Sequence, residues 1–588
     1  MTSEPLVDPR NVNTLWSSVL VETLVRCGVR QAVISPGSRS GPLAVAFARH
    51  SGLEAIPVLD ERSAGFFALG LARQQLRPVA LVCTSGTAGA NYYPAIIEAR
   101  ESGVPLIAIT ADRPPELREC AAGQTIDQQK FYGDFVNFYH ELALPEANEA
   151  RLRYLRQTVA HACSRTASPY GGPVHLNAPF RDPLAPVADA ETALFAAEIS
   201  WERFFAHLAP APAIEPVGRV PAFTASAHGL IVLGPAQPRD PASFVATVGE
   251  IARKLCWPVL ADGLSPARNH AGKIPHLITT YDSILRNPSA AERLKPEVVL
   301  CLGGWPTSKV LRAWLEASGA PIWLVSTRPD NRDALHGNTR QLGISLRVIA
   351  ASLTPDAEIN GYEGMWRGYE DPARRIIDRR LEVDSQLFEP KAAWLLAKHL
   401  PAGTPLFIAS SMPVRDVESV WPANDRQIRP FFNRGANGID GTLSTALGVA
   451  HGGPPAVLLT GDLALLHDSN GFLLRQKFRG SLTIVLINNR GGGIFNHLPV
   501  AEFEPPFEEF FATPPAVDFA SLAAAHGIEH LSVHDWIQFS ERVSVLPRSG
   551  IRILELPTDR RRDASVRKEL YAAAATFDDN VESSPPSD

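Results

Sequence analysis

Short apolar runs alternate with longer amphipathic segments along most of this 588-residue chain. In the first third the alternation predicts strands at 31–35, 55–59, 79–84 and 105–110, and helices at 41–50, 63–74 and 91–102. Strands that alternate with helices indicate parallel βαβ units with right-handed crossovers. Turn residues follow three of these strands, at the edge where open α/β sheets bind ligands.

The same alternation returns twice downstream. It predicts strands at 230–233, 258–261, 298–302 and 322–326, and again at 405–409, 456–459 and 482–487. A Pro- and Ala-rich stretch at 209–227 is typical of a linker, and a charged helical connector is predicted around 369–384. Three α/β regions of similar size suggest duplication at the level of domains.

The predicted fold class is therefore α/β, with three doubly wound parallel-sheet domains. We place the N-terminal domain at 1–190, the central domain at 191–370 and the C-terminal domain at 385–575. The polar residues 576–588 are predicted to form a disordered tail.

Composition narrows the class of protein. With 45% hydrophobic residues, 20% charged residues and a net charge of −6, the chain is typical of a globular protein and lacks the basic character of a nucleic-acid binder. No apolar stretch reaches the ~20 residues of a membrane span, and the first residues lack a signal-peptide pattern, so a cytoplasmic location is expected. The six cysteines form no CxxC pair and are predicted to be buried, reduced and inert.

Two polar positions at strand ends carry the strongest chemical signal. Asp462 and Asn489 each follow an apolar strand, 489 − 462 = 27 positions apart, with a helix predicted at 471–477 between them. Their oxygens, with a backbone carbonyl near Gly491, are the hard ligands with which Mg²⁺ bridges a protein to phosphates. Gly461 and Gly491 would let the backbone approach a diphosphate. The alternative is an ordinary strand end followed by a turn.

The segment Gly461-Asp462-Leu463-Ala464, followed by Asn488-Asn489, resembles the fingerprint of thiamine-diphosphate enzymes. That fingerprint has a second glycine where this chain has Leu463. The resemblance implies thiamine diphosphate as cofactor and Mg²⁺ or Mn²⁺ held by Asp462, Asn489 and Gly491.

A second carboxylate precedes the helix predicted at 63–74. Thiamine diphosphate needs a carboxylic acid against its aminopyrimidine ring for proton transfer. Glu61 follows the strand at 55–59, and pyruvate-oxidase-type enzymes place an acidic residue before a Gly/Ala-rich helix in this way. Glu61 is therefore a predicted catalytic residue. The alternative is that Asp60 and Glu61 only complement the helix dipole.

Four arginines lie in turns after strands rather than on helix faces, namely Arg39, Arg113, Arg415 and Arg434. Arginine binds carboxylates bidentately through its planar guanidinium group. Each of them singly could cap turn carbonyls instead. Their joint placement around one cofactor would suit substrates that carry several carboxylates.

Five segments together resemble the synthases that form 2-succinyl-5-enolpyruvyl-6-hydroxy-3-cyclohexene-1-carboxylate, a family of pyruvate-oxidase-type thiamine-diphosphate enzymes. They are 35–40, 60–66, 84–88, 111–117 and 433–441. The resemblance covers the first and third domains well and the middle domain weakly. It implies that the first domain binds the pyrimidine ring and the third the diphosphate.

The resemblance also implies a reaction: 2-oxoglutarate is decarboxylated, and the succinyl carbanion adds to isochorismate, in menaquinone or phylloquinone biosynthesis. It implies a homodimer or homotetramer whose active sites lie at the dimer interface, with Glu61 from one subunit and Asp462 from the other. Of the basic pair that the family carries in its middle domain, only Lys309 is present here.

Three groups of site residues follow from the resemblance. The catalytic residues are Glu61, Gln124 and Arg39. The substrate-binding residues are Ser38, Arg39, Arg113, Gln124, Lys309, Ser411, Arg415 and Arg434. The cofactor-binding residues are Glu61, Ser411, Ile439, Gly461, Asp462, Leu463, Ala464, Asn489 and Gly491, with Ile439 supporting the bent shape of the cofactor.

The closest alternative is another thiamine-diphosphate decarboxylase or carboligase for 2-oxo acids. Such decarboxylases usually carry paired histidines near the N-terminal substrate turn, and the sequence has none near Ser38 or Asp112. A nucleotide-binding oxidoreductase would need a G-x-G-x-x-G segment after its first strand, which this sequence lacks. A non-catalytic relative would normally have lost Glu61, Asp462 or Asn489.

Overall fold

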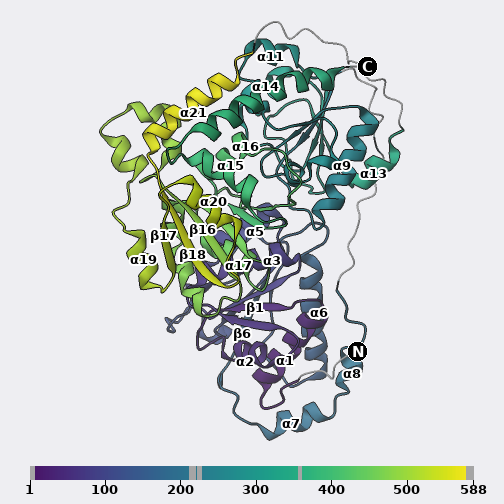
Figure 1. The fold of residues 1–588 in the computed structure, drawn as a ribbon. Coiled ribbons are helices and arrows are strands. Elements are labelled where there is room, and N and C mark those ends of the chain that lie inside the picture. Colours follow the sequence, from purple (N-terminus) through teal and green to yellow (C-terminus); the bar gives the residue numbers. More distant parts are fainter. Residues whose placement is uncertain (1–6, 211–219, 221–227, 355–360, 578–588) are drawn as a thin grey trace. The chain divides into compact units, whose positions relative to one another are not determined.

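The computed structural model describes residues 7–210, 220, 228–354 and 361–577, which form two compact units (Figure 1). The first unit comprises 1–214, 433–453 and 466–480, and the second comprises 215–432, 454–465 and 481–588. Most of the predicted linker at 209–227 and of the predicted tail at 576–588 lies outside the described residues.

The first unit contains a six-stranded sheet in the order β2-β1-β3-β4-β6-β5, with every pair parallel. Its strands are β1 (Gln31–Ile34), β2 (Glu54–Pro57), β3 (Val79–Cys83), β4 (Leu106–Asp112), β5 (Tyr139–Glu141) and β6 (Val174–Pro179). The chain reverses direction across the sheet after β2. Because crossovers are right-handed, α2 and α3 therefore cover opposite faces.

Helices connect and cover the strands of this unit. They are α1 (Val12–Arg26), α2 (Gly41–Arg49), α3 (Glu61–Gln75), α4 (Ala88–Asn91), α5 (Tyr93–Ser102), α6 (Glu149–Arg165), α7 (Ala190–Ala197), α8 (Trp201–Phe204) and α17 (Thr442–Ala450), with 3₁₀ segments η1 (Pro115–Leu117), η2 (Gly133–Phe135) and η5 (Ser469–Gln476). A buried apolar cluster joins α1, α2 and α6 to one face of the sheet.

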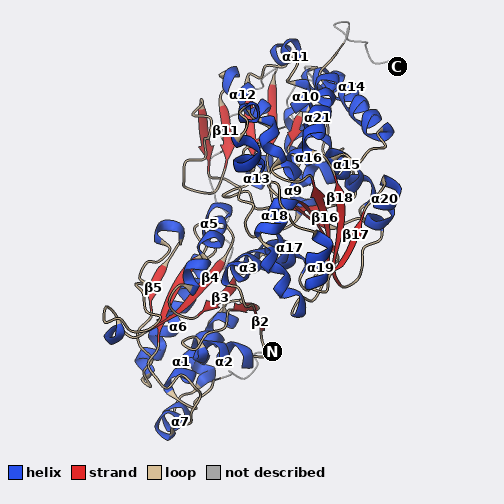
Figure 2. Ribbon diagram, turned by 90° about the vertical axis from the view of Figure 1, so that its left-hand side faces the viewer, coloured by secondary structure: helices blue, strands red, loops and turns tan. Residues whose placement is uncertain are grey.

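The second unit contains two more parallel six-stranded sheets, each covered by helices (Figure 2). One has the order β12-β11-β10-β7-β8-β9, built from β7 (Gly229–Leu233), β8 (Val259–Ala261), β9 (Leu277–Ile278), β10 (Val298–Leu302), β11 (Ile322–Val325) and β12 (Thr339–Leu342). The other has the order β14-β13-β15-β16-β18-β17, built from β13 (Pro405–Ile408), β14 (Arg429–Phe431), β15 (Ala456–Gly461), β16 (Ser481–Asn488), β17 (Glu529–Ser532) and β18 (Gly550–Pro557).

Helices connect and cover these strands. They are α9 (Pro241–Leu255), α10 (Tyr281–Ile284), α11 (Pro288–Arg293), α12 (Lys309–Ser318), α13 (Leu346–Ser352), α14 (Tyr362–Val383), α15 (Glu389–His399), α16 (Met412–Val420), α18 (Asp462–His467), α19 (Phe519–Ala525), α20 (Trp536–Ser544) and α21 (Arg560–Ala574). Shorter turns are η3 (Pro266–Asn269), η4 (Ala271–Lys273), η6 (Gly493–His497), η7 (Pro499–Glu502) and the π-helical η8 (Phe507–Ala512).

The strand orders confirm the predicted fold class of three doubly wound parallel sheets. The first and third sheets share one topology, whereas the middle sheet has the order typical of dinucleotide-binding folds. In that sheet the crevice between β7 and β10 is closed by backbone. A Cβ on Gly234 would lie 1.6 Å from the carbonyl oxygen of Gly304. The loops after these two strands therefore pack backbone against backbone, and the N–H of Gly304 donates to the carbonyl oxygen of Pro235 at 3.1 Å.

Several local predictions need correction. The helix predicted at 91–102 begins two residues later, as α5, after the separate short helix α4, and most of the segment predicted as a helix at 471–477 lies in the 3₁₀ helix η5. Cys120 is exposed and Cys256 is partly exposed, because they lie in a loop after η1 and at the C-terminus of α9. Among the described residues, no helix is both long and apolar enough to span a bilayer.

Candidate functional site

Asp462 and Asn489 lie at the same edge of the third sheet. Their strands are neighbours, with Gly461 of β15 paired to Ile487 of β16. The carboxylate of Asp462 is 1% exposed and accepts hydrogen bonds from the backbone N–H of Leu463 at 2.7 Å and of Gly491 at 2.9 Å. Burial raises the pKa of Asp462 to about 6, although those two N–H groups act in the opposite direction.

The side chain of Asn489 leaves one polar atom without a hydrogen-bond partner. Its Nδ2 donates to Oε1 of Glu389 at 2.7 Å, whereas its Oδ1 is buried and accepts no hydrogen bond from any residue that the structure describes. A buried amide oxygen without a partner is unfavourable unless something else coordinates it. A hard divalent cation is such a partner, so the donor set fits the predicted Mg²⁺ or Mn²⁺.

Two glycines lie close to this pair, one in a tight backbone contact and one beside open space. Gly491 has φ of +130°, and a Cβ there would lie 2.3 Å from the carbonyl oxygen of Ala512. A Cβ on Gly461 would meet no atom within 4 Å, which leaves open space beside Asp462. Leu463 is half-buried and Ala464 is buried in the first turn of α18. The edge thus offers oxygens, backbone and space for a diphosphate with its metal.

Ser411 precedes α16 in a conformation that is rare for a residue with a side chain. Its backbone has φ of 73° and ψ of −126°. Such strain persists only where the surroundings impose it, and it clusters at functional sites. Arg415, one turn into α16, donates from Nη1 to the carbonyl oxygen of Ser411 at 2.5 Å. The two predicted substrate residues of this loop are therefore in direct contact.

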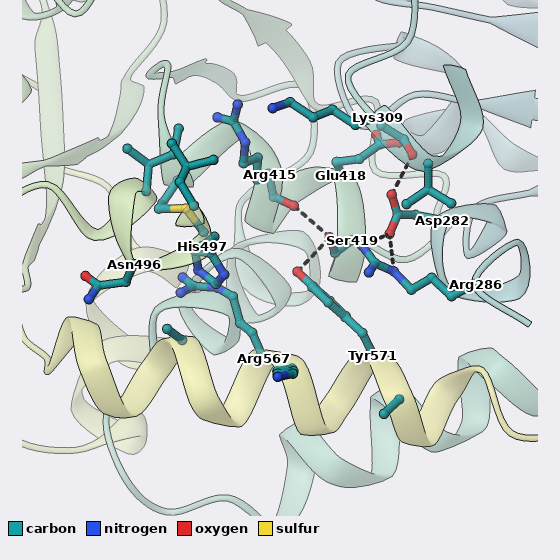
Figure 3. Close-up of a pocket in the computed structure, with 18 of the residues that line it drawn as sticks. Asp282, Arg286, Lys309, Arg415, Glu418, Ser419, Asn496, His497, Arg567 and Tyr571 are labelled. Atoms are coloured by element: carbon teal, nitrogen blue, oxygen red, sulfur yellow. Dashed lines mark hydrogen bonds and ion pairs between the residues drawn. The ribbon is translucent and has the colours of Figure 1, made fainter. Parts of the chain in front are cut away.

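A pocket of about 1420 Å³ brings Arg415 together with Lys309 (Figure 3). Ile494 also lines it, as do Tyr571 and Ser419. Tyr571 donates to Oγ of Ser419 at 3.0 Å, and this Oγ donates to the carbonyl oxygen of Arg415 at 2.9 Å. Lys309 is exposed at the first position of α12, so its ammonium group is available to an anion in the pocket.

The first unit gathers the other predicted arginines of the substrate site. Arg39 is 9% exposed and donates to the carbonyl oxygen of Phe180 at 2.9 Å, while its Nε is buried without a hydrogen-bond partner among the described residues. Arg113 donates to Oγ of Ser85 and, at 3.0 Å, to the carbonyl oxygen of Gln124. Burial and the nearby charge of Arg39 lower the pKa of Arg113. The carboxylate of Asp182 lies 3.8 Å from Nη1 of Arg39, and the charges of Asp112 and Asp182 act on the pKa of Arg113 in the opposite direction.

The remaining predicted residues flank these arginines. Ser38 is exposed in the turn before Arg39. Gln124 is exposed with φ of 59°, and its Nε2 donates to the carbonyl oxygen of Ser85 at 3.2 Å. The structure thus joins Arg113, Gln124 and Ser85 through hydrogen bonds.

Arg434 and Ile439 lie on a loop of the first unit that Glu98 holds in place. The carboxylate of Glu98 accepts from the backbone N–H of Gly435 at 3.0 Å and of Ala436 at 2.7 Å, and it pairs with Arg73 at 2.7 Å. The side chain of Glu98 is 3% exposed. A buried, paired carboxylate that accepts backbone N–H groups makes the conformation of this loop well defined.

Glu61 is the first residue of α3 and is half-buried. The N-cap is Asp60, whose carboxylate accepts from the backbone N–H of Ser63 at 3.0 Å and from Nδ2 of Asn470 at 2.7 Å. The two acidic residues thus have different surroundings. Asp60 completes the hydrogen bonding of the helix end, which leaves the carboxylate of Glu61 available to a ligand.

Sequence reasoning missed the buried acids that support the site. Glu98 acts on residues 337 positions away, and Glu389 acts on Asn489 from 100 positions away. Neither has a local motif. The only signal at Glu389 is an acid in the first turn of a helix, which is common in helices that bind nothing.

Three family models match the chain. They are described as thiamine pyrophosphate enzyme, N-terminal TPP binding domain (residues 16–131), middle domain of thiamine pyrophosphate (217–408), and thiamine pyrophosphate enzyme, C-terminal TPP binding domain (420–545). A 2-succinyl-5-enolpyruvyl-6-hydroxy-3-cyclohexene-1-carboxylate synthase of Microcystis aeruginosa is 54% identical over 94% of this chain and 98% of the relative. The chain belongs to this synthase family.

Further comparisons agree with membership of the synthase family. A synthase of the same name from Nostoc sp. is 52% identical over 97% of this chain and 99% of the relative. Benzoylformate decarboxylase from Polynucleobacter necessarius has a similar structure, with a TM-score of 0.64 over 93% of this chain and 98% of that chain. At 17% identity this likeness shows the fold alone.

Proposed function

We propose that this chain decarboxylates 2-oxoglutarate and joins the remaining succinyl unit to isochorismate. The products are 2-succinyl-5-enolpyruvyl-6-hydroxy-3-cyclohexene-1-carboxylate and CO2, in menaquinone or phylloquinone biosynthesis. The observation that carries the proposal is the identity of more than half over nearly the whole chain to synthases of that name. The benzoylformate decarboxylase, by contrast, resembles this chain at the level of fold only.

The proposed cofactors are thiamine diphosphate and Mg²⁺ or Mn²⁺. Asp462, the Oδ1 of Asn489 and a backbone carbonyl at Gly491 would hold the metal, and the unpartnered Oδ1 supports this assignment. When bound, thiamine diphosphate supplies the electron sink that makes decarboxylation possible. Gly461, Leu463 and Ala464 would line the diphosphate, and Ser411 and Ile439 would contact the rest of the cofactor.

Glu61 is the proposed proton-transfer residue. Its carboxyl group would hydrogen-bond a ring nitrogen of the aminopyrimidine and exchange a proton there. The N-cap hydrogen bond of α3 is already made by Asp60, so Glu61 is not needed to complete it. Because Asp60 already makes the N-cap hydrogen bond, we favour the catalytic role of Glu61 over a purely helix-stabilising one.

The proposed substrate contacts are the cationic and polar side chains of both units. Arg39 and Arg113 with Ser38 and Gln124 offer one set of carboxylate ligands, and Lys309 and Arg415 with Ser411 offer another. Arg434 follows on the loop that Glu98 holds. Two sets of cations suit two substrates that each carry two carboxylates.

The proposed assembly is a homo-oligomer, dimer or tetramer, in which one site takes Glu61 from one subunit and Asp462 from another. The two residues belong to different compact units of the chain, which is compatible with a site completed by a second copy. A cytoplasmic location is likewise proposed.

The test is an assay of the purified protein with thiamine diphosphate, Mg²⁺, 2-oxoglutarate and isochorismate, in which loss of isochorismate is followed by absorbance. Loss should require both the cofactor and 2-oxoglutarate, and Glu61→Gln should lower its rate by ~10²- to 10⁴-fold. If CO2 is released while isochorismate survives, the acceptor is wrong. If neither substrate changes although the cofactor binds, the proposed substrates are both wrong.

A matched control is Glu149→Gln. Glu149 is also the first residue of a long helix, and its N-cap Asn148 likewise accepts hydrogen bonds from backbone N–H groups. If Glu61 only complements a helix dipole, both variants should keep wild-type activity.

A further inference from the structure

Glu389 connects the predicted metal ligands to a buried network of charges. It is the first residue of α15, and it is 2% exposed. Its Oε1 accepts from Nδ2 of Asn489 at 2.7 Å, and its Oε2 accepts from Nη2 of Arg567. Arg567 also donates to both carboxylate oxygens of Asp416, at 2.8 Å each. The backbone N–H of Glu389 donates to Oδ2 of Asp563 at 3.2 Å, which holds the start of the helix.

These contacts determine which way the amide of Asn489 points. Both oxygens of Glu389 act as acceptors, Oε2 from Arg567 and Oε1 from Asn489, so the atom of Asn489 that faces Glu389 is the NH₂ group. The carbonyl oxygen Oδ1 therefore faces the other way, where it is buried and has no hydrogen-bond partner among the described residues. Gly493 makes room for this arrangement, since a Cβ there would lie 2.7 Å from Nδ2 of Asn489.

We propose that Glu389 is a positioning residue for the divalent cation: it holds the amide of Asn489 so that Oδ1, and not the NH₂ group, is presented to the metal. Arg567 holds the carboxylate of Glu389 in place by donating to its Oε2. The inference rests on the metal site of the proposed function. Partners of this kind orient metal ligands and affect affinity without touching the ion.

The decisive variant is Glu389→Gln, which keeps the size of the side chain. Arg567 can only donate, so it will take the single oxygen of the introduced amide, and the NH₂ group of that amide will face Asn489. Asn489 must then turn its own oxygen toward the new NH₂ group and its NH₂ group toward the metal. We expect the Kd for Mn²⁺, measured by EPR of free Mn²⁺ with saturating thiamine diphosphate, to rise by ~10- to 100-fold.

Two further variants separate positioning from folding. Asp416→Asn weakens the other ion pair of Arg567 but leaves the contact between Glu389 and Asn489 intact, so it should lower the melting temperature and keep the wild-type Kd for Mn²⁺. Glu389→Gln combined with Asn489→Asp should restore tight Mn²⁺ binding. An aspartate at the second position can accept from the introduced NH₂ group with one oxygen and bind the metal with the other.

The variant Asp462→Ala distinguishes a failure of the proposed metal site from a failure of the role assigned to Glu389. If Asp462→Ala binds Mn²⁺ as well as the wild type does, the metal site itself is wrong. If Asp462→Ala loses Mn²⁺ while Glu389→Gln keeps the wild-type Kd, the role of Glu389 is overturned and the metal site stands. Should Glu389→Gln fail to fold, Glu389→Asp takes its place: it keeps the charge beside Arg567 and withdraws from Asn489. Wild-type Mn²⁺ affinity in that variant would equally overturn the inference.

Discussion

At the residue scale, Arg39 and Arg113 are two of the proposed substrate contacts. Each is fastened by hydrogen bonds to neighbouring carbonyl or hydroxyl oxygens, and burial and the charge of Arg39 lower the pKa of Arg113. Two cations brought together under partial burial repel each other, and the carboxylate of Asp182, 3.8 Å from Nη1 of Arg39, offsets part of that repulsion. A bound carboxylate would relieve that repulsion.

We expect Arg113→Met to raise KM for one of the two substrates by ~10- to 100-fold, the usual worth of a charged hydrogen bond, with only a small fall in melting temperature from the lost contacts to Ser85 and Gln124. Varying 2-oxoglutarate and isochorismate separately identifies which substrate it is. Arg118→Met is the matched control, because Arg118 is already paired with Asp112 at 3.1 Å and Glu141 at 3.0 Å. That variant should lose stability and keep both KM values. An unchanged KM in Arg113→Met would contradict the assignment.

Asp468 gives a prediction about pH. It is fully buried, and it caps α17 from outside that helix by accepting from the backbone N–H of Ser444 at 2.6 Å and from its Oγ at 3.0 Å. Burial raises the pKa of Asp468 from 3.8 to about 6. Between these values the folded state binds more protons than the unfolded state, so the free energy of unfolding falls as pH rises toward 6, by on the order of 3 kcal/mol.

Asp468→Asn should remove that decline, since an amide can accept from the backbone N–H and donate to the hydroxyl without ionising. The melting temperature of the variant minus that of the wild type should be larger at pH 7.5 than at pH 4.5. Scanning calorimetry of both proteins at both pH values measures this difference. Asp468→Ala, which loses the cap, should be less stable than Asp468→Asn at both. An equal difference between wild type and Asp468→Asn at the two pH values would show that Asp468 is ionised throughout.

At the element scale, α3 and α17 approach so closely that their contact requires glycine. A Cβ on Gly70 would lie 2.1 Å from the carbonyl oxygen of Thr445 and 2.9 Å from Cα of Gly448. Both helices begin at or near predicted site residues. Glu61 begins α3, and Ile439 lies on the loop before α17. The distance between two backbones thus sets where two predicted site residues lie within the first unit.

Gly70→Ala should force these helices apart and destabilise the protein by ~1–3 kcal/mol, with a lower affinity for thiamine diphosphate. Thermal unfolding and a cofactor titration measure the two effects. Gly364→Ala is the control. Gly364 lies exposed in α14 with no atom within 4 Å of a Cβ, so alanine there should raise stability by up to ~1 kcal/mol. Wild-type stability in Gly70→Ala would show that the contact can widen freely.

At the scale of the whole molecule, the chain contributes to its two compact units in alternation. Segments 433–453 and 466–480, which follow strands of the third sheet, belong to the first unit. Glu61 and Asp462 belong to different units, so each chain carries both halves of the proposed site. If one subunit completes the site of another, mutations in the two halves should complement each other.

Co-expressed Glu61→Gln and Asp462→Ala chains should recover about a quarter of wild-type activity, since about half of random dimers are hybrids and each hybrid has one intact site. Each variant expressed alone should remain inactive. The measurement is the isochorismate assay on the co-purified mixture, with two separately tagged chains. Absence of recovery in a confirmed hybrid would mean that one chain supplies both residues.

The strand–helix alternation was sufficient to predict the fold class. The period of apolar residues follows from backbone geometry, which acts over a few positions, so parallel βαβ units could be expected without knowledge of the packing. The edge of the third sheet was predictable for the same reason. Asp462 and Asn489 follow consecutive long strands, and the carboxyl ends of parallel strands meet at one edge.

Where regular structure broke down, prediction was less accurate. The segment predicted as a helix at 471–477 lies mostly in the 3₁₀ helix Ser469–Gln476, where a Cβ on Gly471 would lie 2.9 Å from Oγ of Ser444 in α17. The exposure of Cys120 depends on a loop whose course no periodic pattern describes.

By itself, the sequence determined the three-sheet architecture, the family and the placement of Asp462 and Asn489 at one sheet edge, because these depend on local periodicity and on short motifs. Only the tertiary structure decided which buried acids support the site. Glu389 reaches Asn489 across 100 positions, Glu98 reaches Gly435 across 337, and Asp468 caps a helix that begins 26 positions before it (468 − 442). Such pairs form because folding removes both partners from water and leaves each as the other's hydrogen-bond partner, and no local pattern records that.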